Sequence, residues 1–450
     1  MKKVEKRAIM CLLFGLILLL GVGIFVHREW KNGADWVVYE GNRDVYADGD
    51  LAKGGLYDVD GELLMKNTSD GMEFNEDSSV RAACMHITGD KDNNIATGAN
   101  RVFLDKLIGY DFVNGIYTLN NDGEDVNLTI DADVCATAYN ALNGRKGTVG
   151  VYNYKTGDII CMVSSPTYDP LNVPYTIPEG AYINRFTSAT FVPGSIFKLV
   201  TSAAAIENLD DAYTYTINCT GSEDYGSGDK VTDVSAHGNV DLKKALEVSC
   251  NCYFGKLAEK LGPGLLEEYT EKCGLTQSYD IDGIDTKAST FSYPDGGVNL
   301  AWTGIGQYHD MVNPCAMMVY MGAIANDGTA ALPNLIDSTS VVKEKLQEAT
   351  RTKTKTQDMI DPDTANSIAD MMRNNVENHY GGDSAFPGLA LCAKSGTAEV
   401  GDNRTPNAWF SGFLRDENNP YAFVVLVENG GYGSDVAGSV ANKVLQDIVQ

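Results

Sequence analysis

Three short fragments of this chain hold the residue types from which a serine acyl-transfer site without histidine can be built. In order along the chain they are Ser195–Lys198 (SIFK), Ser249–Asn251 (SCN) and Lys394–Thr397 (KSGT). They supply a serine with a lysine that can take its proton, a polar pair that can relay a proton, and a cationic segment that can bind a carboxylate. We therefore expect the chemistry to depend on bringing these fragments together.

Ser195 stands at the start of a long apolar run. Pro193 and Gly194 break the chain before it, and the residues that follow, up to Glu207, are mostly apolar. This pattern predicts a buried helix with Ser195 and Lys198 on one face of its first turn. Burial would lower the lysine pKa, so that Lys198 could accept the serine proton at neutral pH. The alternative is a Ser195 that caps the helix and a Lys198 that extends to solvent.

Ser249 and Asn251 form the only S-x-N sequence in the chain. They lie between two amphipathic helix candidates, residues 241–248 and 253–261, so we expect them at a helix junction. The Ser249 hydroxyl can both donate and accept, which suits a proton relay, and the Asn251 amide can bond a peptide group of a substrate. The alternative is a pair of polar side chains that only cap the helices.

Lys394–Thr397 follows an apolar run at 389–393 that predicts a β-strand. Two further strand candidates follow at 408–414 and 421–427. A glycine such as Gly396 in an edge strand lets another backbone approach closely. We therefore expect the fragment at the rim of a cleft, and the alternative is a strand end with a solvated lysine.

Together, the three fragments resemble the motif set of the penicillin-recognising serine acyltransferases. Further segments that resemble the family are Lys155–Ile159 (KTGDI, predicted as a hairpin turn between 148–152 and 159–163), Ser165–Pro170 (SPTYDP), Asn184-Arg185, Phe191–Ser195 (FVPGS), Gly304–Gln307 (GIGQ), Asn313-Pro314 and Ile324–Gly328 (IANDG). The likeness runs from about Val126 to the C-terminus. On these residues the chain resembles a class B penicillin-binding protein, a monofunctional D,D-transpeptidase.

The resemblance implies a fold and a reaction. The fold would be α+β, with an antiparallel sheet flanked by helices and a helical subdomain, forming a transpeptidase domain over residues 126–450. The substrate would be a peptidoglycan stem peptide that ends in D-Ala-D-Ala. Ser195 would attack the penultimate carbonyl with Lys198 as base and release D-alanine, and an amine of a second stem would then resolve the acyl-enzyme. β-Lactams would mimic the dipeptide and acylate Ser195.

The resemblance also assigns the remaining site residues. The implied roles are proton relay for Ser249 with Lys394 nearby, substrate-backbone binding for Asn251, and carboxylate binding for Ser395, Gly396 and Thr397. Backbone N–H groups of Ser195 and Thr397 would form the oxyanion hole. No metal and no cofactor is expected, since the chain has no dinucleotide or phosphate-binding loop and its five histidines are scattered singly.

The first 125 residues predict an anchor and a small folded unit. The basic residues of 1–7 precede 8–26, an uncharged apolar stretch long enough to cross a bilayer. The positive-inside rule then predicts a cytoplasmic N-terminus and an extracytoplasmic remainder. No small-residue cleavage site follows, which favours a single-pass signal anchor in the cell membrane over a cleaved signal peptide. Residues 28–125 would form a small β-rich pedestal with a hairpin at 56–64, too short for a glycosyltransferase domain.

Charge and cysteine content exclude some function classes. The formal net charge of −26 argues against binding to nucleic acid or to anionic lipid. Most of the ten cysteines lie in apolar runs as small hydrophobic residues would, and their spacing does not resemble a disulfide framework. The charged stretch 343–355 is predicted to be a solvated insertion.

Three other functions compete with transpeptidation. A β-lactamase shares the nucleophile and the K-[ST]-G strand, but an anchor and a pedestal fit it poorly. A β-lactam sensor would need a cytoplasmic output domain, for which only residues 1–7 would be available. A wall-assembly scaffold stays open, because class B members resemble one another in pairing with a polytopic membrane glycan polymerase through the anchor and pedestal.

Overall fold

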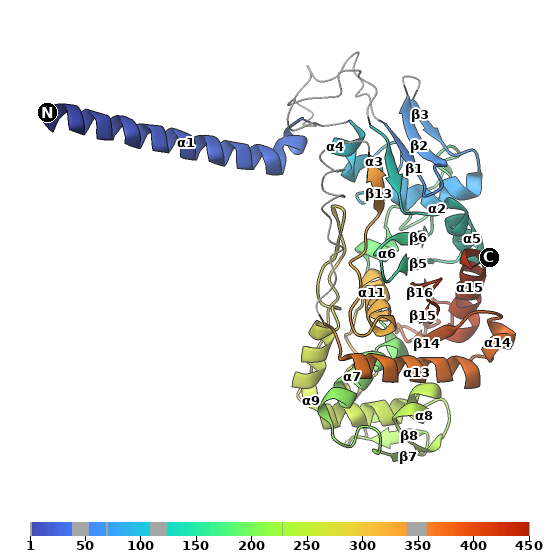
Figure 1. Cartoon of the computed structure of the whole chain (residues 1–450). Helices are drawn as coiled ribbons and strands as arrows, with labels where there is room; N and C mark the ends of the chain where they lie inside the picture. Colours follow the sequence, from blue (N-terminus) through green and yellow to red (C-terminus); the bar gives the residue numbers. More distant parts are fainter. Residues whose placement is uncertain are drawn as a thin grey trace.

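The computed structural model describes most of the chain. The described residues are 2–37, 54–68, 71–108, 124–226, 228–339 and 358–449. Along the long axis of the molecule, a small upper sheet, a larger central sheet and a helical region follow one another, and helix α1 (Lys2–Val37) projects from the upper end (Figure 1). The predicted insertion at 343–355 lies outside the described residues.

The central sheet has five antiparallel strands in the order β14-β15-β16-β5-β6. Their bounds are β5 Gly147–Asn153, β6 Ile159–Ser165, β14 Leu391–Ala398, β15 Asn407–Leu414 and β16 Tyr421–Val427. The predicted antiparallel sheet and the hairpin that joins β5 to β6 are confirmed. The KSGT fragment does not follow the predicted strand but forms the second half of β14, because pairing with β15 continues to Ala398 opposite Asn407.

Helices cover both faces of this sheet. Helices α15 (Gly433–Ile448) and α5 (Ala132–Leu142) lie on one face and α11 (Pro314–Ala325) on the other (Figure 1). With both faces covered, β15 is buried along its whole length, which explains its continuous apolar sequence. Helix α11 is also buried all round, and the Asn313 side chain caps its first turn.

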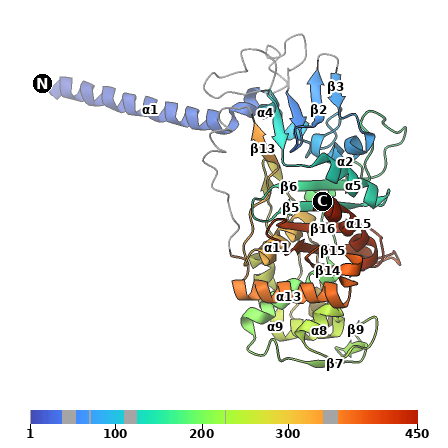
Figure 2. The ribbon, with the colours of Figure 1, turned by 45° about the vertical axis from the view of Figure 1, so that its right-hand side comes forward.

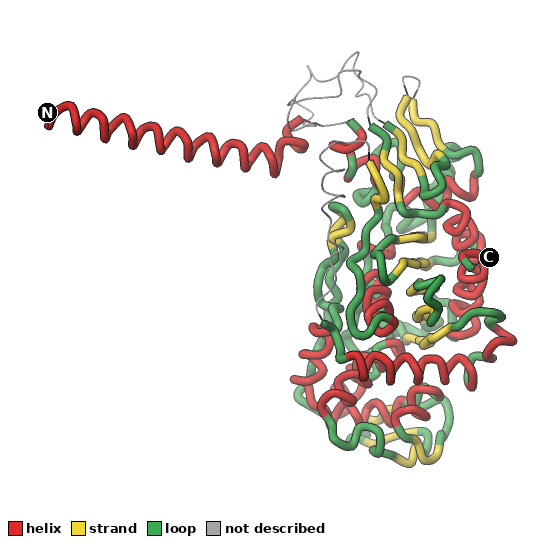
Figure 3. The backbone as a smooth tube through the Cα atoms, in the orientation of Figure 1, coloured by secondary structure: helices red, strands yellow, loops and turns green. Residues whose placement is uncertain are grey.

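The helical region lies beyond the β14 edge of the sheet. In Figure 3 it is the lower end of the molecule, where several helices, drawn in red, lie close together. Its helices are α7 Lys198–Asn208, α8 Leu242–Glu247, α9 Asn251–Lys272, α10 Gly297–Thr303 and α13 Pro362–Asn378. Helix α13 packs between β14 and α8 (Figure 2). Two small hairpin-like pairs complete the region: β7 Ile217–Cys219 with β10 Gly238–Val240, and β8 Ser222–Asp224 with β9 Lys230–Thr232.

The upper sheet joins segments that are far apart in sequence. Its order is β13-β4-β1-β2-β3, with β1 at Gly55–Tyr57, β2 at Leu63–Thr68, β3 at Gly71–Phe74, β4 at Val126–Leu128 and β13 at Ile336–Thr339. The hairpin of β1 and β2 is the one predicted at 56–64. Helix α2 (Ser78–Thr88) packs on α5 of the central unit, and short turns form α3 (Ala99–Val102) and α4 (Leu104–Leu107).

Helix α1 is long and apolar enough to cross a membrane over residues 3–29. Its apolar side chains, from Ile9 to Val26, are exposed, as expected of a segment whose natural surroundings are lipid. The predicted apolar stretch 8–26 lies inside this helix. The helix therefore fits a membrane anchor.

Candidate active site

The nucleophile candidate Ser195 lies in a 3₁₀ turn, Gly194–Ile196, directly before α7. Lys198, rather than Ser195, is the first residue of the helix, so the predicted helix start was three residues early. Gly194 has a φ of 57° and donates its N–H to the Gly306 carbonyl at 2.7 Å. A positive φ is the conformation that glycine adopts without strain, so the turn that presents Ser195 depends on this residue.

Lys198 is fully buried beneath this turn. Its Nζ donates to the Ser249 carbonyl at 2.6 Å, to Asn251 Oδ1 at 2.8 Å and to Ser249 Oγ at 3.2 Å. Burial, with a further contribution from the charge of Lys394, lowers the pKa of Lys198 to about 7. Near neutral pH it can therefore lose its proton and act as a base. The alternative of a lysine that extends to solvent is wrong.

Lys394 approaches the same hydroxyl from the sheet. Its Nζ donates to Ser249 Oγ at 3.1 Å and to the Ser395 carbonyl at 2.8 Å. It too is fully buried, which lowers its pKa to about 7 and rules out the solvated alternative. The Ser249 hydroxyl therefore lies between two lysine amines, either of which can accept or donate a proton near neutral pH.

Ser249 owes its position to the break between α8 and α9. Its φ of 56° is unusual for a residue with a side chain, and it turns the chain sharply between the two helices. Asp233 holds the start of α9 by accepting N–H groups from Asn251 at 2.7 Å and Cys252 at 3.0 Å. The Asn251 side chain donates to the Thr232 carbonyl at 2.9 Å. The predicted helix junction is confirmed.

The three fragments meet at one cleft of about 620 Å³. The sequence-predicted residues that line it are Ser195, Ser249, Asn251, Ser395 and Thr397. Lys198 and Lys394 are buried and do not line the cleft themselves, but both amines bond the hydroxyl of Ser249, which does. Gly396 does not line the cleft. A Cβ there would lie 2.9 Å from the Pro193 carbonyl oxygen, so glycine lets β14 approach the turn that carries the nucleophile.

Sequence reasoning missed several residues of the site. The Tyr380 hydroxyl accepts the Ser395 N–H at 3.0 Å and pairs with Ser395 Oγ at 2.9 Å, so it orients the KSGT strand. The Gly433 N–H, at the start of α15, donates to Thr397 Oγ1 at 3.3 Å. Nothing in the local sequence marks Tyr380 or Asp233. Gln307, another lining residue, belongs to a segment already recognised as a family motif.

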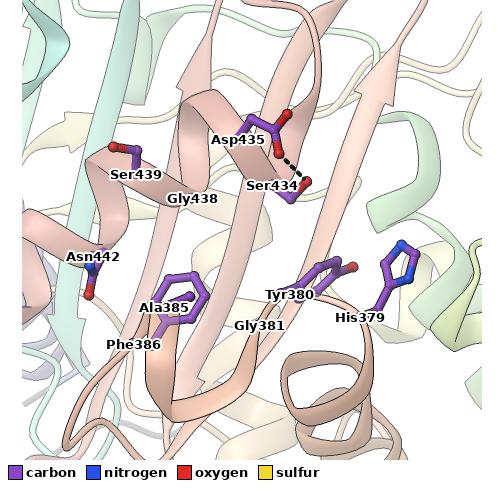
Figure 4. A pocket seen from close by; sticks show the side chains of 10 residues that line it. All are labelled: His379, Tyr380, Gly381, Ala385, Phe386, Ser434, Asp435, Gly438, Ser439 and Asn442. Carbon is purple, nitrogen blue, oxygen red and sulfur yellow. Dashed lines mark hydrogen bonds between the residues drawn. The ribbon is translucent and has the colours of Figure 1, made fainter.

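A second pocket of about 370 Å³ adjoins the cleft. It lies between the short helix α14 (Gly382–Ala385) and the start of α15, and it shares His379 and Ser434 with the cleft (Figure 4). Phe386 and Asn442 line its far end. The two pockets are therefore neighbours that meet at His379 and Ser434.

Comparison with known proteins agrees with this geometry. The family described as the penicillin binding protein transpeptidase domain matches residues 147–448. The peptidoglycan D,D-transpeptidase PbpA of Mycolicibacterium smegmatis is 28% identical over 348 residues, covering 69% of this chain and 68% of the relative. Its match to this chain thus extends over most of both proteins.

Two solved structures share the fold. The ceftriaxone acyl-enzyme complex of penicillin-binding protein A from M. tuberculosis has a TM-score of 0.75 at 24% identity, covering 88% of this chain and 98% of that one. The complex of penicillin-binding protein PBP2 with MreC from Helicobacter pylori has a TM-score of 0.63 at 23% identity, covering 74% and 65%. With the family match over more than half of its length, the chain belongs to the penicillin-binding protein transpeptidase family, as its resemblance to the class B members indicated.

Proposed function

We propose that this protein is a peptidoglycan D,D-transpeptidase that forms an acyl-enzyme on Ser195 and is inhibited by β-lactams at the same hydroxyl. The observation that carries the proposal is the Ser249 hydroxyl between two buried lysines, 3.2 Å from Lys198 Nζ and 3.1 Å from Lys394 Nζ. A purely structural role would not require two buried lysines with lowered pKa values beside a cleft, whereas a proton-transfer site does.

In the acylation step, Ser195 Oγ attacks the carbonyl carbon of the penultimate D-alanine while neutral Lys198 takes the hydroxyl proton. The bond from this carbon to the amine of the terminal D-alanine then breaks. The Ser249 hydroxyl donates its proton to the departing amine and regains one from the lysine pair. An amine of a second stem peptide would reverse this sequence and form the cross-link, which releases Ser195.

Strand β14 supports the roles proposed for the KSGT residues. It is the edge strand of the sheet, and the Ser395 N–H points away from β15 to the Tyr380 hydroxyl. Because N–H groups two residues apart on a strand point the same way, the Thr397 N–H also faces outward, toward the cleft. With the Ser195 N–H it would form the oxyanion hole, and the Ser395 and Thr397 hydroxyls would bind the substrate carboxylate.

The organisation of the chain follows from the same proposal. Residues 1–7 would be cytoplasmic, 8–26 would span the membrane, 28–125 would form the pedestal and 126–450 the extracytoplasmic transpeptidase domain. The chain would carry no glycosyltransferase activity and would work with a polytopic glycan polymerase in the wall machinery. The H. pylori complex supports this in outline, since a related protein there binds a partner, MreC.

Labelling with a fluorescent penicillin tests the proposal. The full chain in detergent should form a stable adduct, and mass spectrometry should locate it on Ser195. Ser195→Ala should abolish labelling, whereas Ser367→Ala, a half-buried serine of α13 that does not line the cleft, should label normally. A D-Ala-D-Ala stem peptide should release D-alanine with the wild type and with Ser367→Ala, but not with Ser195→Ala. Rapid turnover of the penicillin would indicate a β-lactamase, and persistent labelling of Ser195→Ala would refute the assignment.

A further inference from the structure

Three buried cysteines from different elements meet where the N-terminal unit packs on the transpeptidase domain. They are Cys84 of α2, Cys135 of α5 and Cys161 of β6. All three are free thiols within one core, and the thiol of Cys135 is in hydrogen-bonding contact with those of Cys84 and Cys161. Their spacing along the chain does not indicate a pairing, so the packing of α2, α5 and β6 brings them together.

Polar contacts fix the frame around this cluster. On α2, the Arg81 guanidinium donates to both carboxylate oxygens of Asp169, a few residues after β6, at 2.7 Å. The Asp131 N–H, at the N-cap of α5, donates to the Ile160 carbonyl of β6 at 2.9 Å. Cys135 lies one turn further along α5, so this contact sets it beside the strand that carries the third thiol. Both helices are thus held against the same strand.

Cys135 has the surroundings of a reactive thiol. Hydrogen bonds from the thiols of Cys161 and Cys84 and from the Met162 N–H lower the pKa of Cys135 well below that of a free thiol, in spite of its burial. The contact with Cys135 and burial raise the pKa of Cys84, and burial and the same contact raise the pKa of Cys161. Cys135 is therefore the thiol that loses its proton first, and it lies between two candidate partners.

We propose that Cys84 and Cys135 form a disulfide bond that ties α2 to α5, with a small or protein disulfide as the oxidant. The Cys135 thiolate attacks one sulfur of the oxidant, which gives a mixed disulfide and releases a thiolate. The Cys84 thiolate then attacks the Cys135 sulfur, closes the protein disulfide and releases the other half of the oxidant. The two protein thiols lose two electrons and two protons, and the oxidant gains both as two thiols.

Pairing with Cys84 is favoured over pairing with Cys161 by the freedom of the elements. A disulfide holds its sulfurs about 2.0 Å apart, closer than two thiols in contact, so one element must shift. Cys161 is held in β6 by pairing with Val151 of β5, whereas α2 is a helix of 11 residues that can shift as a unit. The bond to Cys84 also closes the longer loop, which restricts the unfolded chain more. The alternative is a cluster of thiols that serve only as small apolar side chains.

The bond would fasten the N-terminal unit to the transpeptidase domain. Cys84 lies within 28–125 and Cys135 within 126–450, so it would link the two units a second time, in addition to the main chain. Because all three sulfurs are buried, the bond forms before α2 docks or when α2 briefly separates from α5. Disulfides persist in oxidising surroundings outside the cell membrane. This expectation for the cell rests on the proposed topology, whereas bond formation in the purified protein does not.

Peptide mapping of the purified protein tests the pairing. The full chain in detergent is incubated with excess oxidised glutathione in urea below its unfolding midpoint, which gives the oxidant access to buried sulfurs. Free thiols are then blocked and the protein is digested without reductant. A linked peptide pair with Cys84 and Cys135 is expected; Cys84→Ala should lose it, and the matched control Cys315→Ala, a buried cysteine of α11, should keep it. Linkage of Cys135 to Cys161, or recovery of all three as blocked thiols, would overturn the proposal.

Thermal unfolding and hydrogen exchange test the role of the bond. The thermal midpoint of the oxidised protein should lie about 3 to 8 °C above that of the reduced protein, and Cys84→Ala should show no such difference. Amide exchange in α2 should slow by about 10-fold on oxidation. Equal midpoints and equal exchange in the two states would show that the bond does not fasten the N-terminal unit. Absence of penicillin labelling in both states would instead contradict the proposed function and not the disulfide.

Discussion

Removal of the Ser249 hydroxyl is the most direct test of the relay. In Ser249→Ala the two lysine amines lose their shared partner, but each keeps others: Lys198 still donates to the Ser249 carbonyl and to Asn251, and Lys394 to the Ser395 carbonyl. We therefore expect the fold to persist while the proton pathway to the leaving amine is lost. General acid–base catalysis of this kind contributes about 10²-fold to 10⁴-fold in rate.

The backbone at this position allows a matched second variant. Ser249 has a φ of 56°, a conformation that costs a residue with a side chain about 1–2 kcal/mol and glycine almost nothing. Ser249→Gly should therefore relieve strain, an effect offset in part by its greater freedom in the unfolded chain, about 0.4–1 kcal/mol. Both variants lack the hydroxyl, but only the alanine variant keeps the strain.

The assay compares rate with stability. The second-order rate constant of fluorescent-penicillin acylation should fall by about 10²-fold to 10⁴-fold in both variants. Thermal unfolding should show Ser249→Gly at least as stable as Ser249→Ala. A near-wild-type acylation rate in either variant would refute the relay. If acylation is slow in Ser249→Ala but normal in Ser249→Gly, the loss of rate comes from strained backbone geometry and not from the missing hydroxyl.

Three further predictions concern the neighbours of this hydroxyl. Because a base must be neutral and the pKa of Lys198 is about 7, the acylation rate should rise as the pH increases through 7; a flat profile from pH 6 to 8 would contradict this. In Gly396→Ala the new Cβ would lie 2.9 Å from the Pro193 carbonyl oxygen, so calorimetry should show a loss of about 1–3 kcal/mol in stability together with slower acylation. Tyr380→Phe leaves the Ser395 N–H without its partner and should lower the free energy of unfolding by about 1–3 kcal/mol in denaturant titrations; unchanged stability would show that water replaces the hydroxyl.

Local sequence predicted much of the secondary structure near the site. The hairpin of β5 and β6, strands β15 and β16, and the break between α8 and α9 follow from hydrophobic period and turn residues, which act over a few positions. The errors lay at boundaries. The helix after Ser195 begins later, since a 3₁₀ turn comes first, and β14 is longer than its apolar run, because pairing with β15 extends it.

By itself, the sequence determined the chemistry available to this protein: a serine, two lysines and polar partners in a recognisable order, and an apolar segment fit to cross a membrane. Only the tertiary structure decided that both lysines are buried against one hydroxyl, that Tyr380 orients the KSGT strand, and that Cys84, Cys135 and Cys161 meet. The reason is physical. Residue types and short periods are local properties, whereas burial and contact depend on how distant elements pack.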